Sequence, residues 1–143
     1  MSRAEDILEI GMLAQRYADA VMRHDADDWG ACWAEDGEWD TGGPEPVRGR
    51  EAIVEAWKAA MGGLSFAVFM VQPSIVEVDG DTGTSRSYVE EVLEAGGNSF
   101  MVYGVYNDEV IRENGAWKFK ARHYNVLYNG PVELAGEKTG YRG

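Results

Sequence analysis

The sequence has few of the side chains that bind metals or cross-link chains. It contains one cysteine, Cys32, and two histidines, His24 and His123. A single cysteine cannot form an internal disulfide, and its scarcity fits a reducing compartment. Two histidines so far apart offer no ligand spacing for a metal. We therefore expect no disulfide framework and no metal site.

The chain also has no long apolar run and no nucleotide-binding motif. No segment approaches the ~20 apolar residues of a membrane span, and the N-terminal residues do not resemble a signal peptide. There is no P-loop and no Gly-x-Gly-x-x-Gly after a strand, so we expect no cofactor. Thirteen basic and 25 acidic residues give a net charge of −12, which argues against nucleic acid or anionic membrane as a partner. These features predict a cytoplasmic protein.

Helical periodicity is confined to the first half of the chain. In residues 4 to 24 the apolar side chains recur at helical spacing, which predicts an amphipathic helix with Tyr17 in the middle of its apolar stripe. Asp25 or Asp27 is expected to cap a second helix through Trp29 and Trp33 that ends near residues 35–37. A short strand is predicted at 38–41, and a third helix from about Gly49 to Gly62–Gly63.

The second half reads as strands joined by short turns. We expect strands over 66–78 (with a bend at Gln72-Pro73), 85–93, 99–112 and 117–128, followed by an irregular tail from 130 to 143. Helices followed by an antiparallel meander indicate one α+β domain over residues 1–143. The predicted form is a cone, in which three N-terminal helices pack on a curved, mainly antiparallel sheet that encloses one apolar pocket.

The last two strands form a hairpin around Asn114-Gly115, a strong turn signal. The return strand alternates apolar and basic residues from Trp117 onward. By period two, His123 and Asn125 share a face with Trp117 and Phe119. This spacing predicts polar groups at the far end of an apolar face.

The order of these elements resembles the SnoaL-like branch of the nuclear transport factor 2-like superfamily. The matching segments span about residues 5–128 and include Tyr17, Asp25 to Trp33, Glu35-Asp36-Gly37-Glu38-Trp39, Gly49-Arg50-Glu51-Ala52-Ile53, Pro73-Ser74-Ile75, Asp79-Gly80-Asp81, Arg86-Ser87-Tyr88 and Gly115-Ala116-Trp117-Lys118. The resemblance implies the cone fold, one deep pocket and a homodimer through the outer sheet face. Relatives include ketosteroid isomerase, scytalone dehydratase, hexachlorocyclohexane dehydrochlorinase, limonene epoxide hydrolase and polyketide cyclases, together with members that have no known catalysis.

The resemblance carries over to the site only in part. The aspartate–histidine dyad of the dehydratases corresponds to Met22 and Val68, so this chain departs from that pattern. In the isomerase pattern, Tyr17 stands at the place of the oxyanion-donating tyrosine. Asp40, or Thr41 by an alternative spacing, lies near the general base, and Tyr103 could donate a second hydrogen bond.

The residues themselves suggest three groups that could move a proton. His123 is a candidate because imidazole side chains in general transfer protons near neutral pH, although a structural partner such as Glu91 would account for it equally well. Glu90 and Glu91 point to opposite faces, and a carboxyl inside an apolar cone would have a raised pKa. An ion pair between Arg86 and Glu90 is the structural alternative. Asp40 is the third candidate, and a strand-end carboxylate is the simpler interpretation of it.

The hypothesis from the sequence is a cofactor-independent isomerase, lyase or cyclase that acts by acid/base chemistry on a small apolar molecule containing a ring. Its expected catalytic residues are Tyr17, Asp40, Glu91 and His123, and its expected substrate-binding residues are Trp39, Trp57, Val68, Met70, Tyr103 and Asn125. The alternatives are a non-catalytic domain that binds a small ligand or dimerises, and a small subunit supporting a larger oxygenase.

Overall fold

The first helix, α1 (Arg3–Arg23), is fixed at both ends by its flanking residues. The computed structural model describes residues 2–143. Ser2 and Glu5 form a capping box, in which each side chain accepts from the backbone N–H of the other. His24 ends the helix in the left-handed conformation, with φ of 53°. The predicted amphipathic helix is thus confirmed, and Tyr17 on its buried stripe faces the sheet.

The second helix is shorter than the sequence suggests. Asp25 caps α2 (Ala26–Ala31), as expected, by accepting from the Asp28 N–H. Strand β1 (Trp33–Asp40) then begins, because Trp33 pairs with Phe119 in the last strand and its indole is fully buried. The prediction that the helix continues through Trp33 to residues 35–37 is therefore wrong. Pairing with a distant strand overrides the local helical pattern.

Helix α3 (Arg50–Gly62) follows the short strand β2 (Val47–Arg48). Gly49 precedes it with a φ of 88°, a conformation that favours glycine. Ile53 and Trp57 are the buried residues of α3, and the rings of Trp57 and Trp29 stack 4.8 Å apart at an interplanar angle of 12°. This stacking joins α3 to α2 across the core.

Five strands form the second half of the chain. They are β3 (Phe66–Val71), β4 (Ile75–Asp79), β5 (Thr82–Ala95), β6 (Asn98–Glu113) and β7 (Ala116–Pro131). The predicted break at Gln72-Pro73 separates β3 from β4, and both pair with β5. Strand β7 continues to Pro131, so the irregular tail begins two residues later than predicted.

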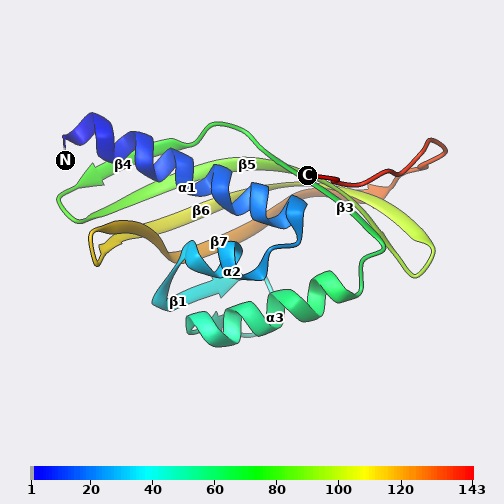
Figure 1. The fold of residues 1–143 in the computed structure, drawn as a ribbon, viewed down its shortest axis with the longest axis horizontal. Helices are drawn as coiled ribbons and strands as arrows, with labels where there is room; N and C mark the ends of the chain where they lie inside the picture. Colours follow the sequence, from blue (N-terminus) through cyan, green and yellow to red (C-terminus); the bar gives the residue numbers. More distant parts are fainter. Residues whose placement is uncertain (1) are drawn as a thin grey trace.

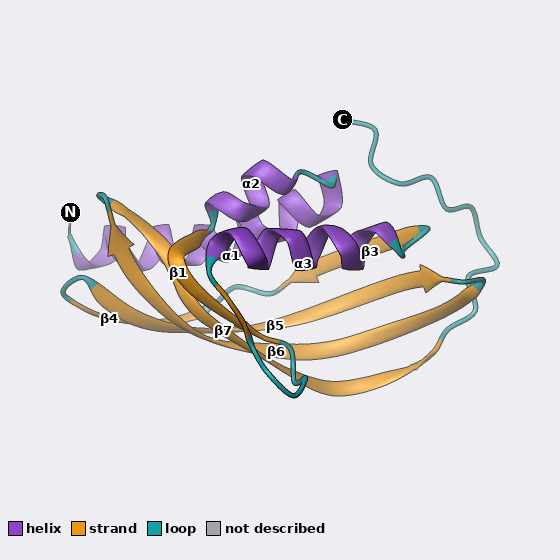
Figure 2. Ribbon diagram, turned by 90° about the horizontal axis from the view of Figure 1, so that it is seen from below, coloured by secondary structure: helices purple, strands orange, loops and turns teal. Residues whose placement is uncertain are grey.

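The strands form one open, mixed sheet in the order β2-β1-β7-β6-β5-β3, with β4 also on β5. All neighbours are antiparallel except β1 and β7. Figure 1 shows α1 lying across the sheet, and Figure 2 shows the sheet curving beneath the three helices. We call the helix-covered face the inner face and the opposite one the outer face. The predicted α+β architecture is confirmed.

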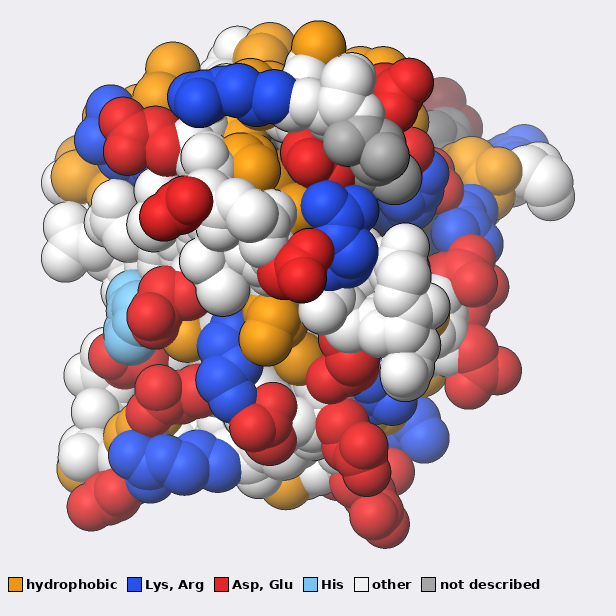
Figure 3. Space-filling model, turned by 90° about the vertical axis from the view of Figure 1, so that its left-hand side faces the viewer, with side chains coloured by type: hydrophobic (Ala, Val, Ile, Leu, Met, Phe, Trp, Pro, Cys, Tyr) orange, Lys and Arg blue, Asp and Glu red, His pale blue; other side chains and the backbone are white. Residues whose placement is uncertain are grey.

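The surface carries acidic and basic side chains close together. Figure 3 shows this mixture at the end of the molecule near the N-terminus. Among the ion pairs are Arg112 with Asp81 and Arg48 with Glu38. No helix within residues 2–143 has the length and apolar character needed to cross a membrane.

Candidate active site

A cavity of about 240 Å³ lies between the helices and the inner face of the sheet. Aromatic and aliphatic side chains form most of its wall: Val21, Trp57, Met61, Leu64, Ala67, Phe69 and Leu93. Three residues with polar groups, Tyr17, Glu91 and Tyr106, also line it. Larger hollows open elsewhere on the surface, but we take this cavity as the candidate site because hydroxyl groups and a carboxyl group meet in an apolar enclosure.

Tyr17 from α1 and Tyr106 from β6 form a buried hydroxyl pair. Their oxygens lie 3.3 Å apart, and both side chains are nearly inaccessible to solvent. Burial raises the pKa of both phenols, so both stay protonated at neutral pH. If one hydroxyl donates to the other, the second keeps a proton that it can donate to a bound molecule.

Glu91 brings a carboxyl group to the same cavity from β5. It faces inward because it pairs with Phe69 of β3 and Val102 of β6, whereas Glu90 faces outward beside Tyr103. Burial raises the pKa of Glu91, and a hydrogen bond from Tyr124 opposes that rise. The Tyr124 hydroxyl donates to Glu91 Oε2 at 2.5 Å. The carboxyl is also close enough for its charge to raise the pKa of Tyr17 and Tyr106.

A buried ion pair lies behind the two tyrosines. Arg122 of β7, only 1% exposed, donates to Asp108 of β6 through Nε at 2.7 Å and Nη2 at 3.1 Å. Its guanidinium lies 3.7 Å from the Tyr106 ring centroid and 4.4 Å from that of Tyr17. Burial opposes its charge, but Asp108 more than compensates, so the pKa of Arg122 is raised. This positive charge lowers the pKa of both tyrosines, against the effect of burial.

Trp39 lies at the end of β1, beside the Tyr106 hydroxyl. Its indole nitrogen is buried and makes no hydrogen bond of good geometry, yet it is close enough to lower the pKa of Tyr106. Its ring meets that of Trp29 edge-on at 5.3 Å. Trp39 and Trp57 thus form cavity walls, as the sequence predicts.

His123 does not face this cavity. Strand β7 has a bulge at Lys120, since Val110 pairs with Phe119 and the next residue of β6, Glu109, pairs with Ala121. The extra residue reverses the alternation, so Arg122 and Tyr124 face inward while His123 and Asn125 face outward. The prediction that His123 shares a face with Trp117 and Phe119 is therefore wrong.

Asp40 lies with His123 on the outer face. His123 Nδ1 is 3.3 Å from Asp40 Oδ2, and both side chains are more than one-third exposed. Asp40 also accepts from the Gly42 N–H, which is the main reason that its pKa is lowered. The structure thus unites these two predicted catalytic residues but places them outside the cavity.

Four of the predicted substrate-binding residues also lie on the outer face, Asn125 because of the bulge and the other three because of the ordinary alternation of β3 and β6. They are Val68, Met70, Tyr103 and Asn125. Ala67 and Phe69, on either side of Val68, are the residues of β3 that line the cavity. The prediction that these four residues contact a molecule in the pocket is therefore wrong for this cavity.

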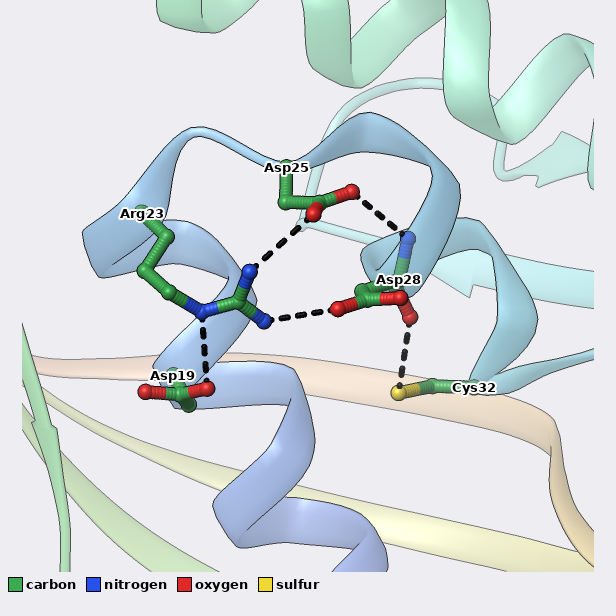
Figure 4. A network of polar contacts seen from close by, with 5 residues as sticks. All are labelled: Asp19, Arg23, Asp25, Asp28 and Cys32. Carbon is green, nitrogen blue, oxygen red and sulfur yellow. Dashed lines mark hydrogen bonds and ion pairs between the residues drawn. The ribbon is translucent and has the colours of Figure 1, made fainter. Parts of the chain in front are cut away.

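The positions assigned to the aspartate–histidine dyad carry no acid or base. The Met22 sulfur accepts from the Phe69 N–H at 3.2 Å, and Val68 points outward. Asp25, the nearest carboxylate, caps α2 and pairs with Arg23, which also binds Asp19 and Asp28 (Figure 4). At these two positions the structure therefore has no aspartate–histidine dyad, as the sequence indicates.

The sequence interpretation missed Tyr106, Tyr124 and Arg122 as parts of the site. Alternate residues of a strand share a face, so Tyr106 lies on the same face as Val102 and Val110, whereas Tyr103 lies on the opposite face. This alternation alone would have predicted Tyr106, and not Tyr103, as the inward-facing tyrosine. Tyr124 and Arg122 could not be predicted in this way, because the bulge at Lys120 turns them inward and no glycine or turn motif marks it in the sequence.

The site offers little for a metal or a reactive thiol. Over residues 2–143, no group of three or more His, Cys, Asp or Glu side chains could hold a metal ion. Cys32 is buried, and burial raises its pKa to about 11, so it is a thiol at neutral pH. The polar groups available for chemistry in the cavity are therefore hydroxyls, an indole N–H and one carboxyl.

These features define an α+β protein with an apolar cavity that holds a carboxyl group and paired hydroxyls. Residues 2–123 match the SnoaL-like domain family, and the chain belongs to that family. No curated protein gives a significant match.

Solved structures of similar fold cover nearly the whole chain. A hexachlorocyclohexane dehydrochlorinase (LinA type 2) is 21% identical, with 99% of this chain and 97% of that chain covered and a TM-score of 0.84. A candidate scytalone dehydratase from Novosphingobium aromaticivorans is 17% identical, with 98% and 96% covered and a TM-score of 0.82. A candidate aromatic ring hydroxylase from the same organism is 27% identical, with 92% and 96% covered and a TM-score of 0.83.

Proposed function

We propose that this chain is a cofactor-independent enzyme of the isomerase or lyase type, acting on a small, neutral, ring-containing molecule in the cavity. The observation that carries the proposal is the placement of the Glu91 carboxyl, with its raised pKa, in the same apolar cavity as the Tyr17–Tyr106 hydroxyl pair. An acid and a base held apart from water are what proton transfer to and from carbon requires.

The proposed step begins with a substrate carbonyl oxygen hydrogen-bonded by the tyrosine pair. The Glu91 carboxylate takes a proton from the carbon next to the carbonyl, and the electron pair of that bond moves to the carbonyl oxygen. Tyr17 and Tyr106 stabilise the oxyanion that forms. In a substrate with a C=C bond beside that carbon, Glu91 then returns the proton at the far end of the dienolate, which completes an isomerisation. In a substrate with a leaving group on the next carbon, the carbonyl re-forms as that group departs with its bonding electron pair and takes the proton from Glu91, which completes an elimination.

The cavity also limits the substrate. Its volume of about 240 Å³ is small for a ligand pocket, since typical pockets hold about 300–1,000 Å³. Its wall is largely apolar, with aromatic rings from Trp57 and Phe69. A compact neutral ring with one carbonyl group suits this combination, whereas an anion would lose its hydration and meet the Glu91 carboxyl instead of a cation.

A binding test comes first. Trp39 and Trp57 line the cavity, so a ring-containing ligand should change the tryptophan fluorescence. We would titrate a panel of cyclic ketones and follow the fluorescence of the native protein and of a Leu93→Trp variant, in which a larger side chain fills the cavity. Saturable changes in the native protein alone support the site. Equal changes in both proteins contradict it.

The second candidate is a non-catalytic domain that binds the same kind of molecule. Two observations support it: no histidine lines the described cavity wall, and the Glu91 carboxyl already accepts a hydrogen bond from Tyr124. A ligand that binds without exchange of its carbon-bound protons would favour this function over catalysis.

We also propose that the outer face joins two copies of the chain. Large apolar side chains are exposed on neighbouring strands of this face: Met70 at 56%, Tyr88 at 47% and Tyr103 at 41%. Large apolar side chains exposed together on one face of a sheet are typical of an interface, and here they surround Glu90. The mass of the protein in solution, measured by sedimentation equilibrium, tests this interface directly.

A further inference from the structure

Gly104 occupies a central position of β6 that is closed to any side chain. A Cβ atom there would lie 2.5 Å from the ring carbons and the hydroxyl of Tyr124. Glycine weakens a strand interior, so its presence commonly marks a close approach of another group. At this point of the sheet, that group is the ring of Tyr124.

The direction of the Tyr124 side chain explains why position 104 must lack a Cβ atom. Tyr124 lies on β7 and Glu91 on β5, and β6 runs between these two strands. Tyr124 pairs with Tyr106 of β6 and Glu91 pairs with Val102, so the two residues are also offset along the sheet, with Gly104 midway between their partners. The Tyr124 ring crosses over Gly104 and packs on the Tyr106 ring with centroids 4.6 Å apart. Its hydroxyl then meets Glu91 Oε2 at 2.5 Å.

We propose that Gly104 and Tyr124 are positioning residues, which together hold the Glu91 carboxyl in one orientation at the cavity. Gly104 leaves the gap, Tyr124 fills it, and the carboxyl is fixed at the end of the ring. The catalytic meaning of this arrangement rests on the proposed function, because it is there that Glu91 moves the proton. The positioning itself does not depend on any substrate.

The groups that face Glu91 allow the direction of the effect to be stated. Tyr17 of α1, Tyr106 of β6 and Tyr124 of β7 are the titratable side chains around it, and β3 contributes the uncharged Phe69. Arg122 lies behind the tyrosine rings. Burial raises the pKa of Glu91, and the Tyr124 hydroxyl lowers it. Removing that hydroxyl should therefore raise the pKa further.

The test measures the proton affinity of Glu91 without a substrate. The full chain is labelled with ¹³C at the glutamate carboxyl, and the Glu91 resonance is identified by its loss in Glu91→Gln. We expect the Glu91 titration midpoint to rise by about half a pH unit or more in Tyr124→Phe, a threefold change in proton affinity. Gly104→Ala should shift it in the same direction, because the new methyl group displaces the Tyr124 ring.

Matched controls exist at the end of the same hairpin. At Gly130 a Cβ would lie 2.3 Å from the Tyr128 hydroxyl, but Tyr128 pairs with Tyr103 on the outer face, on the opposite side of the sheet from the Glu91 carboxyl, and is 53% exposed. Gly130→Ala and Tyr128→Phe should leave the Glu91 midpoint unchanged. The double variant Gly104→Ala/Tyr124→Phe should match Tyr124→Phe alone, since both changes remove the same hydrogen bond.

An unchanged Glu91 midpoint in Tyr124→Phe would overturn the proposal, whether or not Gly104→Ala folds. A double variant shifted well beyond Tyr124→Phe would overturn the role of Gly104. Failure of the proposed function would show differently. The midpoints would then shift as expected, while no cyclic ketone would exchange protons with the native protein.

Discussion

The hydroxyl oxygens of Tyr17 and Tyr106 lie 3.3 Å apart in the core, with the Arg122 guanidinium against both rings. Burial raises the pKa of Tyr106, whereas Arg122, Tyr17 and Trp39 each act in the opposite direction by stabilising its anion. A hydroxyl whose anion is stabilised in this way is a stronger hydrogen-bond donor. Tyr106 is thus the group best placed to bind a developing oxyanion.

Tyr106→Phe should lower kcat/KM for a turned-over ketone by about 10²–10³-fold, the usual cost of losing one oxyanion donor. Tyr103→Phe is the matched control, since Tyr103 lies three residues away on the same strand but on the outer face. Steady-state kinetics of the two variants give the comparison. Equal losses in both, or none in Tyr106→Phe, would contradict the role of Tyr106.

Glu91→Gln should stabilise the free protein at neutral pH. Burial raises the folded-state pKa of Glu91 above its value in the unfolded chain, so the folded state binds this proton more tightly. The resulting stabilisation is fully present below the unfolded pKa, near 4.5, and is lost as the pH rises through the folded pKa. A neutral glutamine avoids the cost of burying the carboxylate.

Urea unfolding of the native protein and Glu91→Gln across this pH range tests that sign. The variant should have the larger free energy of unfolding at pH 7, and the difference should shrink toward pH 4. Glu90→Gln, on the outer face, is the control and should show no such trend. A Glu91→Gln protein that is less stable at neutral pH would show that the carboxylate is better solvated than the structure indicates.

Asp108→Ala should destabilise the fold strongly. The change leaves Arg122 charged, buried and without its carboxylate, and it also removes the acceptor of the Ser85 hydroxyl. Breaking a buried pair by removing one partner costs about 3–5 kcal/mol. The free energy of unfolding in urea measures the loss.

Asp19→Ala is the control for that comparison. Asp19 also binds an arginine, Arg23, but its side chain is 63% exposed (Figure 4). Its removal should cost about 0–1 kcal/mol. If Asp108→Ala costs no more than Asp19→Ala, the Arg122–Asp108 pair does not hold the inner face together.

A dimer through the outer face predicts a mass of twice 15.8 kDa by sedimentation equilibrium. Met70→Asp and Tyr88→Asp should shift the protein toward the monomer, because each places a charge in the apolar patch. Leu8→Asp changes an equally exposed apolar residue on α1, away from that face, and should leave the mass unchanged. A native protein that sediments as a monomer would rule out this interface.

The fold could be predicted because its main determinants are local in the sequence. The Asp25 cap of α2, the Asn114-Gly115 turn and the break at Gln72-Pro73 each act within a few residues, and the structure has all three where they were expected. The extent of α2 was mispredicted because Trp33 pairs with Phe119, a contact that no local pattern contains.

The site was predicted in part: Val68, Met70 and Tyr103 were assigned to the wrong face of strands whose alternation is unbroken. Tyr17, Trp39, Trp57 and Glu91 all lie at the cavity as expected. His123 was misplaced because the bulge at Lys120 shifts the phase of β7 by one residue. One inserted residue therefore exchanged a histidine for a tyrosine at the inner face, and with it the expected chemistry.

Solvent exchange of carbon-bound protons tests the central claim most directly. A cyclic ketone that binds the cavity is incubated in D₂O, and loss of its α-proton signal is followed by ¹H NMR. We predict catalysed exchange with the native protein and with His123→Ala, and exchange at the uncatalysed rate with Glu91→Gln. Exchange that survives in Glu91→Gln, or is lost in His123→Ala, would contradict the assignment of the chemistry to the cavity carboxyl.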